Sequence, residues 1–505
     1  MKTNQRKIGA VLSYVSIVAN TLVQLLYTPF LIRKLGQSEY GLFSLVSSII
    51  GYLTVLDLGF GNAIIVHSAK YRAKGETEKE RKLHGMFHVI YIVIGIIAGI
   101  AGVTLALCSD EIFGEKMTPD ELHKMRIMLY MLSFNLFITF AFSIYNSIIT
   151  ANEEFVFQKL LAVINTIAKP LLMIPLLFLG FKSIALCAVI TVVNIAVLFT
   201  NYLFCKKKLG LRIKFQGFDK KLFKTIFAYS FWIFLTQIVD KINWSADQFI
   251  LGAVSGTIAV SVYSAASTLN TLFINLSTAI SGVMLPKVSK MVAGGASSGE
   301  LTKEWIKVGR IQFLIVFMMA CGLVLVGKQF IKIWLGESFD DSYYVALLLI
   351  LPAVLSLIQS LGLAIMQAMD KFRFKALSTF VMAIFNIVLS VVLAQKYGAP
   401  GAAFGTTISI ILCNVIVMNI YYWKAIRLDV FSFWKNILAM AVKLLIPFVL
   451  TIVIEKVISL EGIRALLVYG FIYTVSYLAI AYMITMNNYE KAFVNKLVLK
   501  VIKRR

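Results

Sequence analysis

The chain has few charged residues for its length, and few of those are acidic. Of its 505 residues only 15% are charged, 25 are acidic and 8 are proline, whereas 59% are hydrophobic. A soluble protein has roughly a quarter of its residues charged. The composition therefore excludes an ordinary soluble enzyme and indicates a membrane protein.

Motifs for nucleotide, metal and disulfide chemistry are also missing. No GxxxxGK[ST] or GxGxxG run occurs, the five cysteines form no CxxC pair, and the four histidines lack ligand spacing. No loop has room for a nucleotide-binding domain. We therefore expect no cofactor and no metal, and any transport must draw on an ion gradient, the membrane potential or the gradient of the substrate itself.

Fourteen long apolar stretches fill the chain, and a helix needs roughly 20 apolar residues to cross a bilayer. They predict an all-α integral membrane protein with 14 transmembrane helices. The approximate spans are Ile8–Leu31, Gly41–His67, Met86–Leu107, Ile127–Ala151, Leu160–Leu179, Ile184–Phe204, Phe223–Gly252, Ile258–Leu285, Ile311–Val326, Tyr344–Met369, Ala376–Ala394, Ala402–Trp423, Ile437–Ile454 and Ala465–Met486.

The charges between these spans predict their orientation. If the N-terminus is cytoplasmic, 35 of the 49 basic residues lie in cytoplasmic segments and 11 in the opposite segments. This bias predicts that both termini are cytoplasmic. The net charge of +24 then places basic clusters against the anionic lipids of the inner leaflet, and it does not indicate a nucleic-acid partner.

Three weak echoes at nearly one offset indicate an internal duplication. Residues 151–160 match residues 368–377 at four of ten positions, at an offset of 217, and two shorter echoes have offsets of 216 and 218. We infer two parallel-repeat six-helix lobes around a central cavity. The expected parts are an N-terminal lobe (1–205), a basic cytoplasmic linker (206–225), a C-terminal lobe (226–424), and appended helices 13 and 14 with a basic tail (425–505).

Three local motifs give the chain a family resemblance. Thr28–Gly36 is followed by Glu39–Phe43, the second span ends in Leu56–Ala63, and the seventh ends in Ala246–Gly252. These segments resemble the multidrug/oligosaccharidyl-lipid/polysaccharide (MOP) exporter superfamily, and within it the Wzx-type flippases of O-antigen and capsule repeat units. The resemblance covers most of the chain and is strongest in residues 8–80 and 225–290.

The resemblance implies a flippase of the bacterial cytoplasmic membrane. Its substrate would be an undecaprenyl-pyrophosphate-linked oligosaccharide, moved from the inner to the outer leaflet by alternating access for cell-surface polysaccharide biosynthesis. It implies no catalytic residues. Further candidate partners are a coupling proton or sodium ion and a polysaccharide polymerase or ligase.

Charged residues inside the spans are the candidates for substrate binding, because such residues usually face a cavity or a partner. Asp240, Asn243 and Asp247 share one face of the seventh span. A pyrophosphate needs cations, for which Lys169 and Lys241 are the first candidates. Two further residues, Arg33 and Lys34, would act at the outer mouth. The alternative is that the lysines form static ion pairs, and that Arg33 and Lys34 only anchor a helix end.

Asp57, Gly59 and Gly61 are candidates for gating or ion coupling. They lie close together near the end of the second span. Glycines in a membrane helix permit either a hinge or close helix packing, and the sequence leaves both interpretations open.

Three other functions fit parts of the pattern. An ion-coupled multidrug antiporter of the same superfamily would not need cavity lysines. A lipid II flippase fits the spans and the lysines equally well. A membrane glycosyltransferase or polymerase would need a catalytic carboxylate, for which the acidic loop 110–121 is the one candidate.

Overall fold

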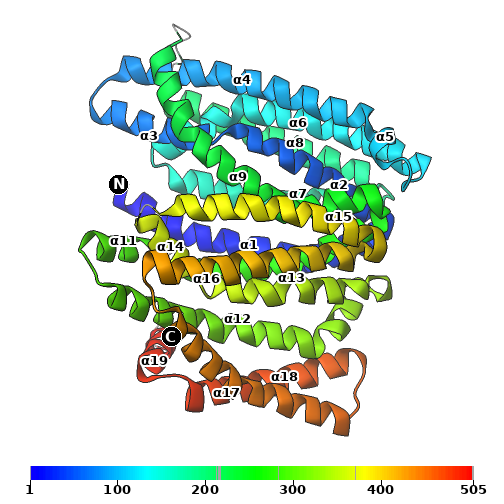
Figure 1. Cartoon of the computed structure of the whole chain (residues 1–505). Helices are drawn as coiled ribbons and strands as arrows, with labels where there is room; N and C mark the ends of the chain where they lie inside the picture. The colour runs from blue at the N-terminus through cyan, green and yellow to red at the C-terminus, as the bar shows by residue number, and fades with distance from the viewer. Residues whose placement is uncertain (1, 212, 214–217, 282–283, 370, 503–505) are drawn as a thin grey trace. The chain divides into compact units, whose positions relative to one another are not determined.

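The computed structural model describes residues 2–211, 213, 218–281, 284–369 and 371–502, and every regular element in those residues is helical. This confirms the expected all-α fold. The chain forms two compact units, Met1–Ser264 and Ala265–Arg505 (Figure 1). Each unit is described by itself below.

The first unit consists of long helices that pack side by side. Its close contacts depend on small residues: a Cβ atom on Gly95 of α4 would lie 2.9 Å from the carbonyl oxygen of Phe137 in α6. The helices are α1 (Lys2–Leu35), α2 (Gln37–Leu53), the 3-10 helix η1 (Thr54–Asp57), α3 (Phe60–Ala73), α4 (Thr77–Leu107), α5 (Ser109–Phe113), α6 (Pro119–Ala151), α7 (Phe155–Phe178), α8 (Ser183–Lys207), α9 (Lys220–Val254) and the start of α10 (Gly256–Ser281).

Helix α9 packs inside the first unit. It runs along α2, η1 and α3, and Phe60 of α3 lies 6.3 Å from Phe223 between ring centroids. The boundary between compact units therefore falls after Ser264. The division into lobes of residues 1–205 and 226–424 stays a prediction from the repeat.

The second unit contains the rest of α10 and the helices that follow it. These are α11 (Leu285–Ala293), α12 (Ser298–Leu335), the 3-10 helix η2 (Glu337–Phe339), α13 (Asp341–Leu357), α14 (Ser360–Ala368), α15 (Phe372–Ile410), η3 (Ile411–Val417), α16 (Met418–Tyr421), η4 (Tyr422–Ile426), α17 (Val430–Val457), α18 (Gly462–Ile480), η5 (Ala481–Thr485) and α19 (Asn488–Ile502). Three of these segments, η3, η4 and η5, are π-helical.

Twelve helical stretches in the described residues are long and apolar enough to cross a membrane. One of them, Arg373–Ile426, has 54 residues and is interrupted at Gly398, whose φ is 60° and ψ −137°, so it holds two expected spans. The expected seventh span corresponds to α9, a helix of 35 residues. The fold is therefore consistent with fourteen spans.

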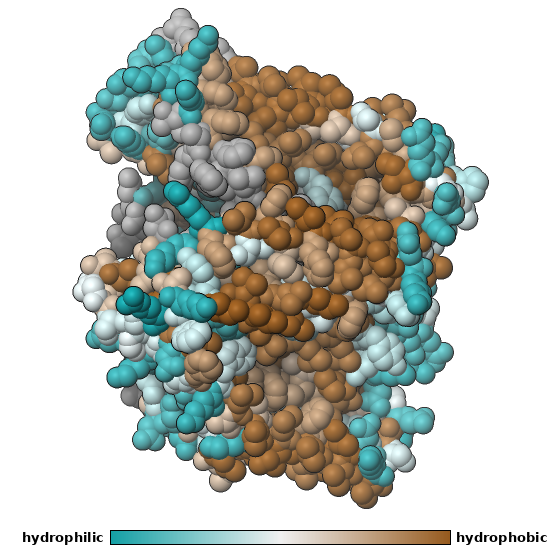
Figure 2. Space-filling model, viewed as in Figure 1, coloured by the Kyte–Doolittle hydropathy of each residue, from teal (hydrophilic) through white to brown (hydrophobic). Residues whose placement is uncertain are grey.

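The surface has the polarity of a membrane protein. Large apolar side chains are exposed along the middle of the helices; for example, Leu171 is 67%, Val442 69% and Phe471 70% exposed. Figure 2 shows hydrophobic residues along the helices and hydrophilic residues gathered at their two ends. This is the arrangement expected where acyl chains surround the helices.

A buried ion pair fixes the last helix of the second unit. The Arg310 guanidinium in α12 donates to both carboxylate oxygens of Glu490 in α19, at 2.6 and 2.9 Å, and it also donates to the carbonyl oxygen of Thr485. Glu490 is only 2% exposed. Two charges buried in this way depend on each other, because either one alone would be a buried charge without a counter-charge.

Candidate functional site

The second expected span is broken at the residues proposed for gating. The 3-10 turn η1 ends at Asp57, and the next two residues, Leu58 and Gly59, have left-handed φ angles of 53° and 71° before α3 begins. The expected span Gly41–His67 lies within one candidate membrane span, Gln37–Ala73, but it is formed by two helices, α2 and α3, instead of one. Two consecutive left-handed residues end one helix and start another with a change of direction.

Asp57 points toward α4 at this break. The hydroxyl of Tyr91 donates a hydrogen bond of 2.9 Å to Asp57 Oδ1. Gly61 is the second residue of α3, where a Cβ atom would be 3.7 Å from the Tyr91 hydroxyl and 3.3 Å from Ser147 Oγ of α6. The three candidates therefore surround a small polar contact between α3, α4 and α6.

Lys241 lies against α2. A Cβ atom on Gly51 would be 3.6 Å from the Lys241 ammonium nitrogen, and one turn away Ser48 Oγ donates a 3.2 Å hydrogen bond to the carbonyl oxygen of Ser245. The Lys241 side chain is half-buried. In the part of the chain that the structure describes, its ammonium makes no hydrogen bond or ion pair. The ammonium therefore lies at ordinary contact distance from the position that a side chain at residue 51 of α2 would occupy.

Asp247 lies further along α9 and is only 3% exposed. The hydroxyl of Tyr263 in α10 donates to Asp247 Oδ2. This carboxylate therefore joins the two helices of the α9–α10 hairpin. The side chains of Asp240 and Asn243, which the sequence places on the same face, lie outside the described residues.

The structure places Lys169 in a different helix pair from Lys241. It is half-buried in α7, which packs along α1 and α8, and the helix continues through Pro170 and Pro175. Lys241 packs on α2 instead. Lys241 in α9 and Asp57 in η1 thus belong to two elements that contact each other. Lys169 in α7 lies on another face of the unit.

Arg33 and Lys34 are exposed in the last turn of α1. The Lys34 ammonium lies 4.4 Å from the ring centroid of Phe178 at the end of α7. Such a cation–π contact anchors the ends of two helices. For Lys34 the geometry thus favours the helix-anchoring interpretation.

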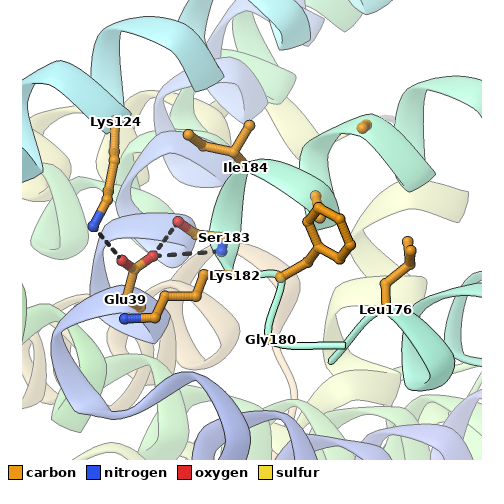
Figure 3. A pocket seen from close by; sticks show the side chains of 10 residues that line it. Glu39, Lys124, Leu176, Gly180, Lys182, Ser183 and Ile184 are labelled. Atoms are coloured by element: carbon orange, nitrogen blue, oxygen red, sulfur yellow. Dashed lines mark hydrogen bonds and ion pairs between the residues drawn. The ribbon is translucent and has the colours of Figure 1, made fainter. Parts of the chain in front are cut away.

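Sequence reasoning missed a carboxylate that is held by three groups near the start of α2. Glu39 is 8% exposed and accepts a 2.8 Å hydrogen bond from the Lys124 ammonium in α6. It also accepts hydrogen bonds from the hydroxyl and the backbone N–H of Ser183 at the start of α8 (Figure 3). This contact joins α2, α6 and α8.

A second missed carboxylate, Glu121, joins α6 to α2 and to α10. Its Oε1 accepts hydrogen bonds of 2.5 Å from Ser38 Oγ and 2.7 Å from Thr257 Oγ1. Its other oxygen completes a capping box with Thr118. The pattern Thr118-x-x-Glu121 is a readable helix start at the end of the acidic loop 110–121, which the sequence suggested as the one candidate source of a catalytic carboxylate.

Close backbone contact reinforces this junction. A Cβ atom on Gly41 of α2 would lie 1.9 Å from the carbonyl oxygen of Thr257, and one on Gly252 of α9 would lie 2.6 Å from Leu45 Cδ2. Helices α2, α6 and the α9–α10 hairpin are thus held together at the ends that the charge pattern places outside.

Comparison with known proteins adds a family match and named relatives. The family model described as "Polysaccharide biosynthesis protein" matches residues 8–292. The chain is 21% identical over 411 residues to a putative O-antigen transporter of Shigella flexneri, which covers 79% of this chain and 94% of the relative. It is 22% identical over 482 residues to the uncharacterized membrane protein EpsK of Bacillus subtilis (strain 168), covering 93% of each.

Solved structures share the fold. The lipid II flippase MurJ in an inward closed conformation superposes with a TM-score of 0.73 at 17% identity, over 94% of this chain and 98% of that one. An inward-facing multidrug resistance MATE family transporter of the MOP superfamily superposes with a TM-score of 0.65 at 14% identity, over 86% and 99%.

Proposed function

Because the chain belongs to the polysaccharide biosynthesis protein family, and with it to the MOP exporter superfamily of flippases and transporters, we propose that it moves an undecaprenyl-pyrophosphate-linked oligosaccharide from the inner to the outer leaflet. It is a multi-pass membrane transporter rather than an enzyme, since two of its relatives and a solved structure that shares its fold are named as transporters or flippases. We propose the substrate, the direction of its movement and the residues that bind it in addition to this transporter class.

The observation that carries the proposal is the Lys241 ammonium beside Gly51. A charged group inside a membrane helix costs about 2.5–3.5 kcal/mol on insertion scales, so an unpaired one needs a compensating function. A pyrophosphate provides such compensation, because its oxygens accept charge-assisted hydrogen bonds from an ammonium group. A cationic drug would instead be repelled by this lysine.

The neighbouring residues suggest how binding could be coupled to movement. Asp57 ends the 3-10 turn that contacts α9, and Asp247 connects α9 to α10 through Tyr263. In our proposal Lys241 attracts the pyrophosphate, Asp57 and Asp247 take a coupling proton or sodium ion, and the break at Gly59 lets α3 move relative to α2. Lys169, Asp240 and Asn243 would provide further substrate contacts.

The proposed transport follows alternating access between two six-helix lobes, with both termini in the cytoplasm. The contacts of Glu121 and Glu39 would then close the outer side while substrate enters from the cytoplasmic side. Release would require Ser38 and Thr257 to separate from Glu121.

We expect the Lys241→Ala variant to lose flipping activity. The purified chain is reconstituted in proteoliposomes with undecaprenyl-pyrophosphate oligosaccharide, and substrate accessibility to an external probe is measured with and without an ion gradient. The rate should fall at least tenfold, the effect of losing about 1.4 kcal/mol of binding to a charged group.

Lys443→Ala is the matched control, because Lys443 is an exposed lysine of α17 outside the proposed lobes. It should transport like the unmodified chain. Equal flipping rates for the Lys241→Ala and Lys443→Ala variants would show that Lys241 does not bind the substrate. Uptake of a cationic dye without any flipping of the lipid-linked oligosaccharide would show that the protein is a multidrug antiporter.

A further inference from the structure

A cavity of about 560 Å³ lies beside the Glu39 contact in the first unit, away from Lys241. Its walls come from the start of α2, from α6 and from the α7–α8 hairpin (Figure 3). Sites for small molecules in proteins have volumes of roughly 300–1,000 Å³. The cavity is therefore large enough for a ligand and is not a packing defect.

Of the charged side chains that line the cavity, some are paired with an opposite charge and one is not. Glu39 is neutralised by Lys124, and Lys124 also pairs with Asp120 at 2.5 Å. Lys182, at the turn before α8, lines the cavity and is exposed. Among the residues that the structure describes, none makes an ion pair or hydrogen bond with the Lys182 ammonium. The cavity thus offers one available positive charge.

The rest of the lining is apolar. Leu176 comes from the end of α7, Phe181 from the turn, and Ile184, Ala185 and Ala188 from the start of α8. Phe181 is 54% exposed and continues into the apolar surface formed by Phe178 and Leu179, which are 65% and 73% exposed. A ligand can therefore enter sideways from the acyl chains of the bilayer.

We propose that this cavity binds an anionic phosphodiester lipid of the outer leaflet, with its phosphate at Lys182 and part of its acyl chain against Leu176, Phe181 and Ile184. One available cation matches the single negative charge of such a lipid. The apolar wall matches its chain, and the orientation predicted from the charge pattern places this end of the helices outside. The site is separate from the proposed substrate contacts.

The first test is native mass spectrometry of the full chain in detergent, titrated with phosphatidylglycerol. Lys182→Gln should weaken binding about tenfold, because the lost interaction is a hydrogen bond to a charged group. Lys396→Gln is the matched control, since Lys396 is also an exposed lysine on the predicted outer side, but in the second unit. It should bind the lipid like the unmodified chain.

A second variant tests the cavity itself. Ala188→Phe fills the space without changing the charge, so it should remove lipid binding while Lys182 is still present. Its melting temperature, compared with that of the unmodified chain, shows that the variant is folded. A folded Ala188→Phe variant that binds phosphatidylglycerol normally would overturn the proposal.

Two ligand comparisons complete the test. Zwitterionic phosphatidylethanolamine should bind more weakly than phosphatidylglycerol, and equal binding would overturn the role of Lys182. Undecaprenyl pyrophosphate should not displace the bound lipid. If it does, the cavity is a substrate site and the phospholipid assignment is wrong. Flipping by the Lys241→Ala variant is measured in a separate experiment. The proposed flippase function and the proposed lipid site can therefore each be contradicted without the other.

Discussion

Glycine residues determine where the helices of the first unit approach most closely. Gly41 and Gly252 each lie where a neighbouring backbone or leucine occupies the space of a side chain, whereas at Gly51 the Lys241 ammonium lies at ordinary contact distance from an added Cβ atom. In membranes, small residues allow such approaches, and dispersion contacts then hold the helices together. A methyl group at Gly41 would have to displace the carbonyl of Thr257, which a side-chain rotation cannot relieve.

We expect Gly41→Ala to destabilise the protein by about 1–3 kcal/mol, the usual cost of overpacking. The apparent melting temperature in detergent is the measurement. Gly470→Ala is the control, because Gly470 lies in α18 with no atom within 4 Å of its added Cβ. That change should leave the melting temperature unchanged or raise it, since alanine favours a helix. Equal melting temperatures for both variants would contradict the close contact at Gly41.

At the scale of single residues, the sequence located charges but not their partners. It placed Asp57 and Lys241 inside spans, and the structure has Asp57 in the candidate span Gln37–Ala73 and Lys241 in the long helix α9. It did not pair Glu39 with Lys124, because 85 residues separate them and a single sequence carries no information on which helices are neighbours. The capping box at Thr118 was readable, whereas the contact of Glu121 with Thr257 depends on folding.

At the scale of elements, the break between α2 and α3 is the departure from a regular span. Hydropathy alone predicted one helix, because apolar residues continue on both sides of the break. The signal was local: Asp57 and two nearby glycines interrupt the apolar run. Gly59 adopts a φ of 71°, which costs an L-residue roughly 1–2 kcal/mol, so this position needs glycine whether or not the break moves.

A strain-matched pair of variants separates these roles. Gly59→Ala and Gly75→Ala introduce the same backbone strain, because both glycines have a φ of 71°, but Gly75 lies in the turn between α3 and α4. We expect Gly59→Ala to slow flipping several-fold more than Gly75→Ala, with similar melting temperatures. Equal flipping rates would show that the break is only structural.

At the scale of the whole molecule, the sequence predicted the fold class well because the bilayer imposes it. Backbone groups in hydrocarbon must be satisfied within helices, so span length and polarity are strongly constrained. The two merged spans at Arg373–Ile426 show the limit of this argument, since their connection at Gly398 remains within one helical stretch. Which helices pack together depends on side-chain detail that hydropathy does not encode.

The orientation gives the prediction at this scale. A reporter enzyme that is active only outside the cytoplasm should be inactive when fused after Arg505 or after Lys208, and active after Lys182. Fusions after Lys182 and Lys208 flank α8, so they differ by one crossing. If the reporter were instead active after Arg505 and Lys208 and inactive after Lys182, the orientation would be the reverse of the predicted one. The proposed direction of transport and the leaflet of the lipid site would then be reversed as well.

The ion pair between Arg310 and Glu490 also constrains the order of synthesis. Its two residues are 180 positions apart, and Glu490 belongs to the last helix. At about 5–20 residues per second, roughly 10–35 s pass between the synthesis of these two residues. During that interval the end of α12 that the charge pattern predicts to be cytoplasmic carries a cation without its counter-charge. The Arg310 contact in the second unit therefore cannot form until Glu490 has been synthesised, and a chain stopped before Glu490 would expose this arginine without its counter-charge to cellular quality control.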